Sequence, residues 1–328
     1  MTTETQFDKA VEFQLDAMRV SARTQSDVRV ILIRMERELL GKLAGPMTEW
    51  IRTRIKQQLA EVRAVIASYY DDAANVAAQA TNAVGEVAAK ITVAGLELGG
   101  AAVIMPNAAT LEAIVSNAII QGAVQADWWS RQSSDTAFRF ATAVRQGIAA
   151  AETNQQIIAR VRQEMAVTRA NAAALVQTSV ATVANDARQA VFDANADIIK
   201  RYRAIATLDT HTCSRCAPLD GLEWLPDGTP VGHSTPQPRY PLHYNCRCMM
   251  LPIVIDGPRE GQRAAAGGPV KASTTFSDWL ERQPKSKQEE VLGKGRADLY
   301  RAGKITLSDL TSGAGRPLTL AELRSKYA

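Results

Sequence analysis

Apolar residues recur every three or four positions over most of residues 5–201, which is the spacing of one face of an α-helix. The first such pattern covers residues 5–43, and a Gly45-Pro46 pair follows it. A second pattern begins at Thr48 and continues to about Gly99. Two long helices joined by Gly-Pro predict an antiparallel helical hairpin over residues 1–105, a shape suited to docking against another protein.

The segment 106–201 also predicts helices. Pro106-Asn107 opens a shorter one, and Thr153 with Gln156 gives the spacing of a capping box. Residues 167–201 contain no proline or glycine, so we expect one long helix there.

The remaining chain predicts smaller elements. Strand-like runs near 202–208 and 247–255 flank a polar loop, and together they define a module over residues 202–255. A Gly-, Pro- and Ala-rich linker is expected over residues 256–273. The tail, residues 274–328, predicts three or four short helices, with capping-box spacings that begin at Thr275, Ser286 and Thr319. The expected fold is mainly α: an elongated helical N-terminal region, a small module with short β-strands, and a small helical C-terminal tail.

Composition supports helices rather than a β-sandwich, because aromatic residues make up only 5% of the chain and alanine is abundant in its first part. The net charge is +4, and the segment from Ile253 onward holds 13 Lys/Arg against 9 Asp/Glu, which accounts for the whole excess. Dedicated duplex-DNA binders concentrate basic residues in a stripe, and this chain does not. Six basic residues of the tail are nevertheless candidates for contact with DNA or an acidic partner, the alternative being a solvated helix surface. They are Lys285, Lys287, Lys294, Arg296, Arg301 and Lys304.

No apolar run is long enough to span a membrane, because Glu97 interrupts the best stretch and Pro106 follows it. The acidic, polar start predicts no secretory leader, so we expect synthesis in a cytoplasm. In that compartment clustered thiols favour metal or redox chemistry over disulfides.

All the cysteines and histidines lie in one short segment, which runs from His211 to Cys248. Cys213-Ser-Arg-Cys216 forms one half of a candidate metal site, and His243-Tyr-Asn-Cys246-Arg-Cys248 forms the other. Zinc in structural sites takes four cysteine or histidine ligands in a closed tetrahedron. The spacing therefore predicts a structural zinc knuckle, with a proline-rich loop between its halves.

The expected ligands are Cys213, Cys216, His243 and Cys246, with Cys248 as the alternative fourth ligand. If Cys246-Arg247-Cys248 enters a strand, its two sulfurs point to opposite faces and only one can ligate. His211 and His233 are expected to be solvent-exposed loop residues.

Other interpretations of the cluster remain open. A redox C-x-x-C motif normally opens a helix, whereas Ala217-Pro218 and a loop follow Cys216. A pair of disulfides would need an oxidising compartment, and free thiols are a third alternative. A nuclease of the HNH type would need a general-base histidine, for which only His243 is placed, and the zinc site already requires it.

The residues Asp209, Thr212, Leu219-Asp220-Gly221 and Pro241-Leu242, with the clustered cysteines, His243 and Arg247, resemble the pattern of the Mu F-like minor head proteins of tailed bacteriophages. The preceding Asn185-Asp-Ala-Arg188 and the tail are also similar to that family. The resemblance covers roughly residues 140–328.

The resemblance implies a structural component of the virion, inside or at the portal vertex of the capsid. It would contact the portal, the major capsid protein or both, and packaged DNA as a further partner, and it would not be an enzyme. A zinc-dependent nucleic-acid-binding protein and a cryptic HNH-like nuclease are the alternative functions.

Overall fold

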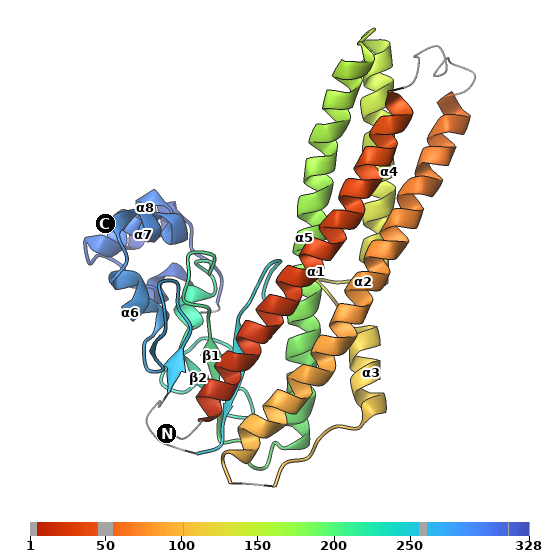
Figure 1. The fold of residues 1–328 in the computed structure, drawn as a ribbon. Helices are drawn as coiled ribbons and strands as arrows, with labels where there is room; N and C mark the ends of the chain where they lie inside the picture. Colours follow the sequence, from red (N-terminus) through yellow and green to blue (C-terminus); the bar gives the residue numbers. More distant parts are fainter. Residues whose placement is uncertain (1–4, 45–54, 101, 256–260, 314, 328) are drawn as a thin grey trace. The chain divides into compact units, whose positions relative to one another are not determined.

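The computed structural model describes residues 5–44, 55–100, 102–255, 261–313 and 315–327 (Figure 1). The protein is mainly helical, with small antiparallel sheets and short C-terminal helices, as predicted. It divides into two compact units, each described by itself. The helical unit comprises Arg19–Val84 and Ala113–Val183, and the sheet unit comprises Met1–Met18, Gly85–Glu112 and Ala184–Ala328. These units do not follow the contiguous ranges expected from the sequence, because three long helices contribute residues to both.

The long helices lie where the apolar periodicity predicts them. They are α1 (Gln6–Leu43), α2 (Ile55–Glu97), α3 (Ala108–Asn117), α4 (Gln125–Ala149) and α5 (Asn154–Ala194). The predicted Gly45-Pro46 turn and the predicted helix start at Thr48 lie outside the described residues. The Thr153–Gln156 capping box is confirmed, because each residue's side chain accepts a hydrogen bond from the other's backbone N–H. No helix among the described residues combines the length and the apolar character that a membrane span requires.

The core of the helical unit lies between segments of α1, α2, α4 and α5, which run side by side in Figure 1. Its larger side chains include Leu32, Met35, Ile66, Phe140 and Val161. Alanines fill many of the remaining core positions, and their small side chains let helix axes approach closely. The abundance of alanine in this part of the sequence is thus a packing feature.

Buried polar groups in this core are paired across three helices. The hydroxyl groups of Tyr70 on α2 and Thr136 on α4 lie 2.8 Å apart, and Thr136 lies 3.3 Å from the hydroxyl of Thr168 on α5. Burial raises the pKa of Tyr70 to about 12. The phenol therefore stays neutral, and its hydrogen bond satisfies a group that would otherwise be costly to bury.

A three-stranded antiparallel sheet forms the centre of the sheet unit. Strand β1 (Arg201–Ile205) lies between β2 (Glu223–Trp224) and β3 (Met249–Ile253), and Arg203 pairs with Leu251. Both strand-like runs of the sequence are thereby confirmed. All five residues of β3 are buried, although it is an edge strand, and an edge position accommodates Pro252, which has no backbone N–H.

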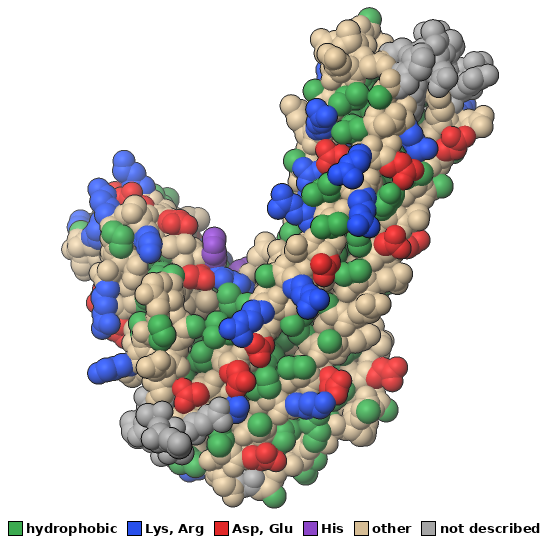
Figure 2. Space-filling model, viewed as in Figure 1, with side chains coloured by type: hydrophobic (Ala, Val, Ile, Leu, Met, Phe, Trp, Pro, Cys, Tyr) green, Lys and Arg blue, Asp and Glu red, His purple; other side chains and the backbone are tan. Residues whose placement is uncertain are grey.

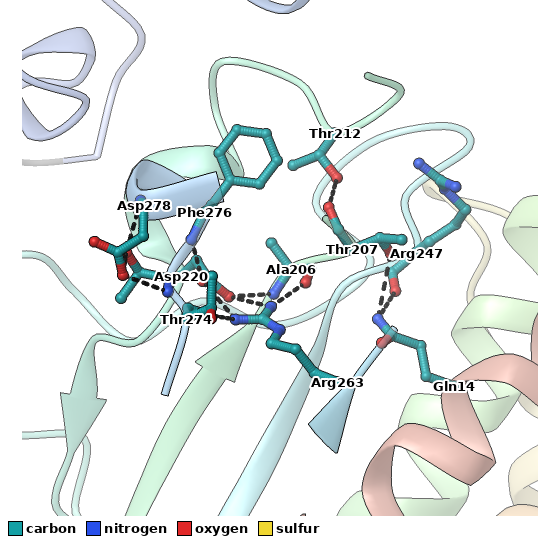
Figure 3. A network of polar contacts seen from close by, with 11 residues as sticks. Gln14, Ala206, Thr207, Thr212, Asp220, Arg247, Arg263, Thr274, Phe276 and Asp278 are labelled. Carbon is teal, nitrogen blue, oxygen red and sulfur yellow. Dashed lines mark hydrogen bonds and ion pairs between the residues drawn. The ribbon is translucent and has the colours of Figure 1, made fainter. Parts of the chain in front are cut away.

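The described part of the expected linker is structured. It contains β4 (Gln262–Arg263) and β5 (Val270–Lys271), which pair with each other. Arg263 reaches the loop before β2, where its guanidinium donates two hydrogen bonds to the Asp220 carboxylate, at 3.0 and 2.9 Å (Figure 3). The side chains of Arg263 and Asp220 are only 3% and 1% exposed. A buried ion pair therefore fixes this segment to the sheet module, which its Gly- and Pro-rich composition does not indicate.

Four short helices make up most of the tail, as predicted: α6 (Phe276–Glu281), α7 (Lys285–Leu292), α8 (Lys294–Arg301) and α9 (Leu320–Tyr327). The Thr275–Asp278 capping box is present at the start of α6. The expected capping box at Ser286 is wrong, because α7 begins one residue earlier. The backbone carbonyl of Pro284 accepts hydrogen bonds from Lys287 and Gln288, so the proline is the residue that precedes the helix.

Candidate metal centre

Two turns of the same kind present the candidate ligands. In the first, the backbone N–H of Cys216 donates to the carbonyl of Cys213 at 3.1 Å, and in the second that of Cys246 donates to His243 at 3.2 Å. Asn245 in the second turn has φ 62°, a left-handed conformation that asparagine tolerates better than most residues. Each turn brings two donor side chains separated by two residues to one side, as the C-x-x-C and H-x-x-C spacings predict.

The donor atoms of the two turns lie close together. The Nε2 atom of His243 is 3.1 Å from the Cys213 sulfur and 3.3 Å from the Cys216 sulfur, and the sulfurs of Cys216 and Cys246 are 3.9 Å apart. Ligands on a tetrahedral zinc are separated by about 3.4–3.8 Å, given Zn–S and Zn–N bonds of about 2.3 and 2.0 Å. The cluster thus has the dimensions of a metal site.

Five donors, not four, meet at this site. One group of mutually close donors is Cys213, Cys216 and His243, and another is Cys216, Cys246 and Cys248. Cys216 is common to both groups and is buried. It is therefore the central donor of the cluster, which is suited to hold a metal such as zinc.

The expectation that a strand would turn Cys246 and Cys248 to opposite faces is wrong. Strand β3 begins at Met249, so the Cys246-Arg247-Cys248 segment precedes it and its side chains need not alternate. Both sulfurs lie within reach of Cys216. The choice of Cys246 over Cys248 as the fourth ligand consequently stays a prediction.

A hydrogen bond orients the His243 ring. Its Nδ1 atom lies 2.7 Å from the carbonyl oxygen of Tyr244, and a carbonyl can only accept. Nδ1 is therefore protonated, and Nε2 faces the sulfurs. Histidine ligands of metals are commonly oriented in this way, by a hydrogen bond from the ring nitrogen that does not bind the metal.

The electrostatics of the cluster favour negative charge at its outer sulfurs. The pKa of Cys213 is lowered to about 4, first by its hydrogen bond with Cys216 and then by that with His243. The pKa of Cys246 is likewise lowered far below its usual value, chiefly by Cys216. The pKa of His243 is raised to about 10, first by Cys213. A bound cation would take the place of the shared protons, so metal binding releases protons from this cluster.

Residues around the cluster hold the two turns in place (Figure 3). Arg247 forms a bidentate ion pair with Asp209, with both distances 2.6 Å. Thr212 donates from its hydroxyl to the carbonyl of Thr207 at 2.6 Å. These contacts give Asp209, Thr212 and Arg247, which belong to the pattern noted in the sequence, a role in positioning the ligands.

One supporting residue was not predicted. The side-chain amide of Gln14 on α1 donates to the carbonyl of Arg247 at 3.0 Å and to the Thr207 hydroxyl at 3.3 Å. Gln14 and Arg247 are 233 positions apart, and nothing in the local sequence around Gln14 indicates this contact. The start of α1 thus takes part in supporting the site.

The two other histidines lie in loops. His211 is exposed. His233 is half-buried, with its ring 5.0 Å from that of Trp224 and its Nε2 atom 2.9 Å from the carbonyl oxygen of Glu223. Neither belongs to the two donor groups found among the described residues.

The six basic residues of the tail do not form one patch. Lys285 pairs with Glu289, Arg301 pairs with Glu289 and Asp298, and Arg296 donates to the carbonyl of Leu318. Basic and acidic side chains alternate over these helices in Figure 2. Such mixing is typical of a solvated surface.

We therefore expect charge reversal of the other three, in the variant Lys287→Glu/Lys294→Glu/Lys304→Glu, to leave DNA affinity within about twofold, as for ordinary surface charges. Fluorescence anisotropy with a labelled duplex at several salt concentrations measures it. If the three lysines contact phosphates, the salt dependence of log affinity will instead lose about 0.9 for each contact. That result would assign DNA binding to the tail.

Comparison with known families gives one match. The profile of the family described as Phage Mu protein F like protein matches residues 139–251. The matched segment begins within α4 and continues through α5 and the entire Cys/His cluster to β3. No curated protein and no solved structure shows a significant match to the chain. The chain therefore contains a domain of the Phage Mu protein F-like family, which spans residues 139–251.

Proposed function

We propose that this protein is a structural minor head protein of a tailed bacteriophage, which acts by binding the portal or the major capsid protein. The observation that carries the proposal is the family match over residues 139–251, which includes the complete donor cluster. We further propose that Cys213, Cys216, His243 and Cys246 bind a structural zinc ion. The residues present fit such an ion, because soft sulfur and imidazole donors converge at the spacing of a tetrahedral site.

The surroundings of His243 favour a structural over a catalytic role. Its Nε2 atom faces two sulfurs and its Nδ1 atom is bonded to a carbonyl oxygen. Neither ring nitrogen is directed toward a water or a substrate, as the general base of an HNH-type nuclease would be. Incubation of the zinc- or magnesium-loaded protein with supercoiled plasmid tests this alternative, and nicking above that of a Cys216→Ser variant would support it.

The helical unit is the part we assign to docking. Long helices present extended faces, and Phe138 on α4 is 69% exposed, although aromatic side chains on a surface are favoured anchors at interfaces. The sheet unit, with its donor cluster, would then serve as a rigid module near the DNA.

Head particles assembled with the tagged chain provide the test. We expect the chain to co-purify and cross-link with the portal, and Phe138→Asp to lower its copy number per particle by about tenfold or more, the effect of losing an interface anchor. Quantitative mass spectrometry of purified particles measures the copy number.

Gln146→Asp, an exposed polar position on the same helix, is the matched control and should be incorporated normally. Normal incorporation of Phe138→Asp would remove α4 from the docking surface. Absence of the chain from particles altogether would contradict the proposed function.

A further inference from the structure

A small cavity of about 20 Å³ lies inside the sheet unit, away from the Cys/His cluster. It is lined by the first turns of α1, the last turns of α2, Arg188 of α5, and Leu251 and Pro252 of β3. A volume of about 10–15 Å³ accommodates one water-sized particle, so the cavity has room for a single small guest. Most of its lining is apolar, which makes the few polar groups informative.

Arg188 is the charged group of this cavity, and it is only 3% exposed. Its terminal nitrogens donate to the Met249 sulfur at 3.1 Å and to the Met250 carbonyl at 2.7 Å. The guanidinium also lies 4.7 Å from the centre of the Phe13 ring. None of these groups carries a negative charge, and no carboxylate in the described parts of the chain pairs with Arg188.

Two buried N–H groups at this cavity are unsatisfied. The Nε atom of Arg188 and the Nε2 atom of Gln6 are buried and have no hydrogen-bond partner among the described residues. Both residues line the cavity, and Lys9 adds a second positive charge to its wall. An unpaired buried charge and an unpaired buried donor are each costly, and one negatively charged guest would compensate both.

We propose that this cavity binds a small monovalent anion, chloride, held by the Nε–H of Arg188 and the side-chain amide of Gln6. A water molecule could accept the same hydrogen bonds but would leave the guanidinium charge uncompensated. Burial alone lowers the pKa of Arg188 to about 9, and an adjacent anion would restore its preference for the charged form. The site would join α1 to α5 and β3 within the sheet unit.

Chloride-35 line broadening with the zinc-loaded full chain tests the proposal, with bromide as the competing ion. We expect excess broadening that bromide reverses, and a bromide anomalous peak in contact with both nitrogens in crystals grown in sodium bromide. Arg188→Met should abolish the broadening. Gln6→Met, which retains the charge, should weaken chloride binding about fivefold, the effect of losing one hydrogen bond.

Gln189→Met is the matched control, because Gln189 is exposed and bonds to Asp193 rather than to the cavity. Its broadening should equal that of the parent. Gln6→Met also keeps the test informative if Arg188→Met fails to fold. Equal broadening in the parent and Gln6→Met, or a crystal in which bromide leaves the cavity to a water molecule, would overturn the proposal.

Discussion

Replacing Cys216 by serine should abolish zinc binding and unfold the sheet around the cluster. Cys216 is the only donor shared by the two groups, so its loss leaves neither group intact. Structural zinc contributes about 10–16 kcal/mol of apparent binding free energy in small zinc-binding domains, and this energy is available only to the folded state. We therefore expect this substitution to have the largest effect of any single change in the chain.

Elemental analysis for zinc and amide hydrogen exchange over residues 201–253 measure the effect. Ser214→Ala, in the same turn but without a donor role, should keep one zinc per chain. Cys248→Ser should also keep it if Cys246 is the fourth ligand, whereas loss of zinc from Cys248→Ser but not from Cys246→Ser would reverse that assignment. A Cys216→Ser protein with full zinc content and unchanged exchange would rule out the proposed site.

Asp220→Asn should destabilise the folded protein by about 3–5 kcal/mol, the usual effect of removing one partner of a buried ion pair. The carboxylate accepts hydrogen bonds from Arg263 and also from the backbone N–H groups of Ala206, at 2.7 Å, and Phe276, at 2.8 Å. An asparagine keeps one acceptor oxygen but places an NH₂ group against the remaining donors, and it leaves the Arg263 charge buried without compensation. Three separate segments would lose their common partner.

Urea unfolding of the zinc-saturated protein, followed by tryptophan fluorescence, measures this change. Asp298→Asn is the control, because Asp298 is exposed and its pairing with Arg301 should contribute less than about 1 kcal/mol. If Asp220→Asn is no more destabilising than this control, the buried pair does not hold the segment of β4 and β5 to the module.

Features that depend on local sequence were predictable. Helix periodicity located α1 to α5, and the spacing of cysteines and histidines identified the two turns before their geometry was known. Even Asp220, which belongs to the sequence pattern through its Leu-Asp-Gly setting, could be singled out, although only the structure shows that it binds Arg263.

Contacts between distant segments were not predictable, for a physical reason. Arg263 lies among Gly, Pro and Ala residues typical of a linker, and only the buried carboxylate of Asp220 makes its burial favourable. Similarly, the periodicity of α1 defines its apolar face but does not distinguish the turn around Gln14, which bonds beside the cysteines, from the turns that enter the helical core. The assignment of one helix to two units is likewise a property of its partners.

The hydrogen bond between Gln14 and Arg247 also sets an order of events during synthesis. The two residues are 233 positions apart. At translation rates of about 5–20 residues per second, the first turns of α1 wait roughly 10–50 s before their partner leaves the ribosome. Helices form in about a microsecond, so α1 can be helical throughout this interval while its partners in the sheet unit do not yet exist. Completion of the donor cluster at Cys248 is then the step at which the beginning of the chain and its last third first become one folded unit.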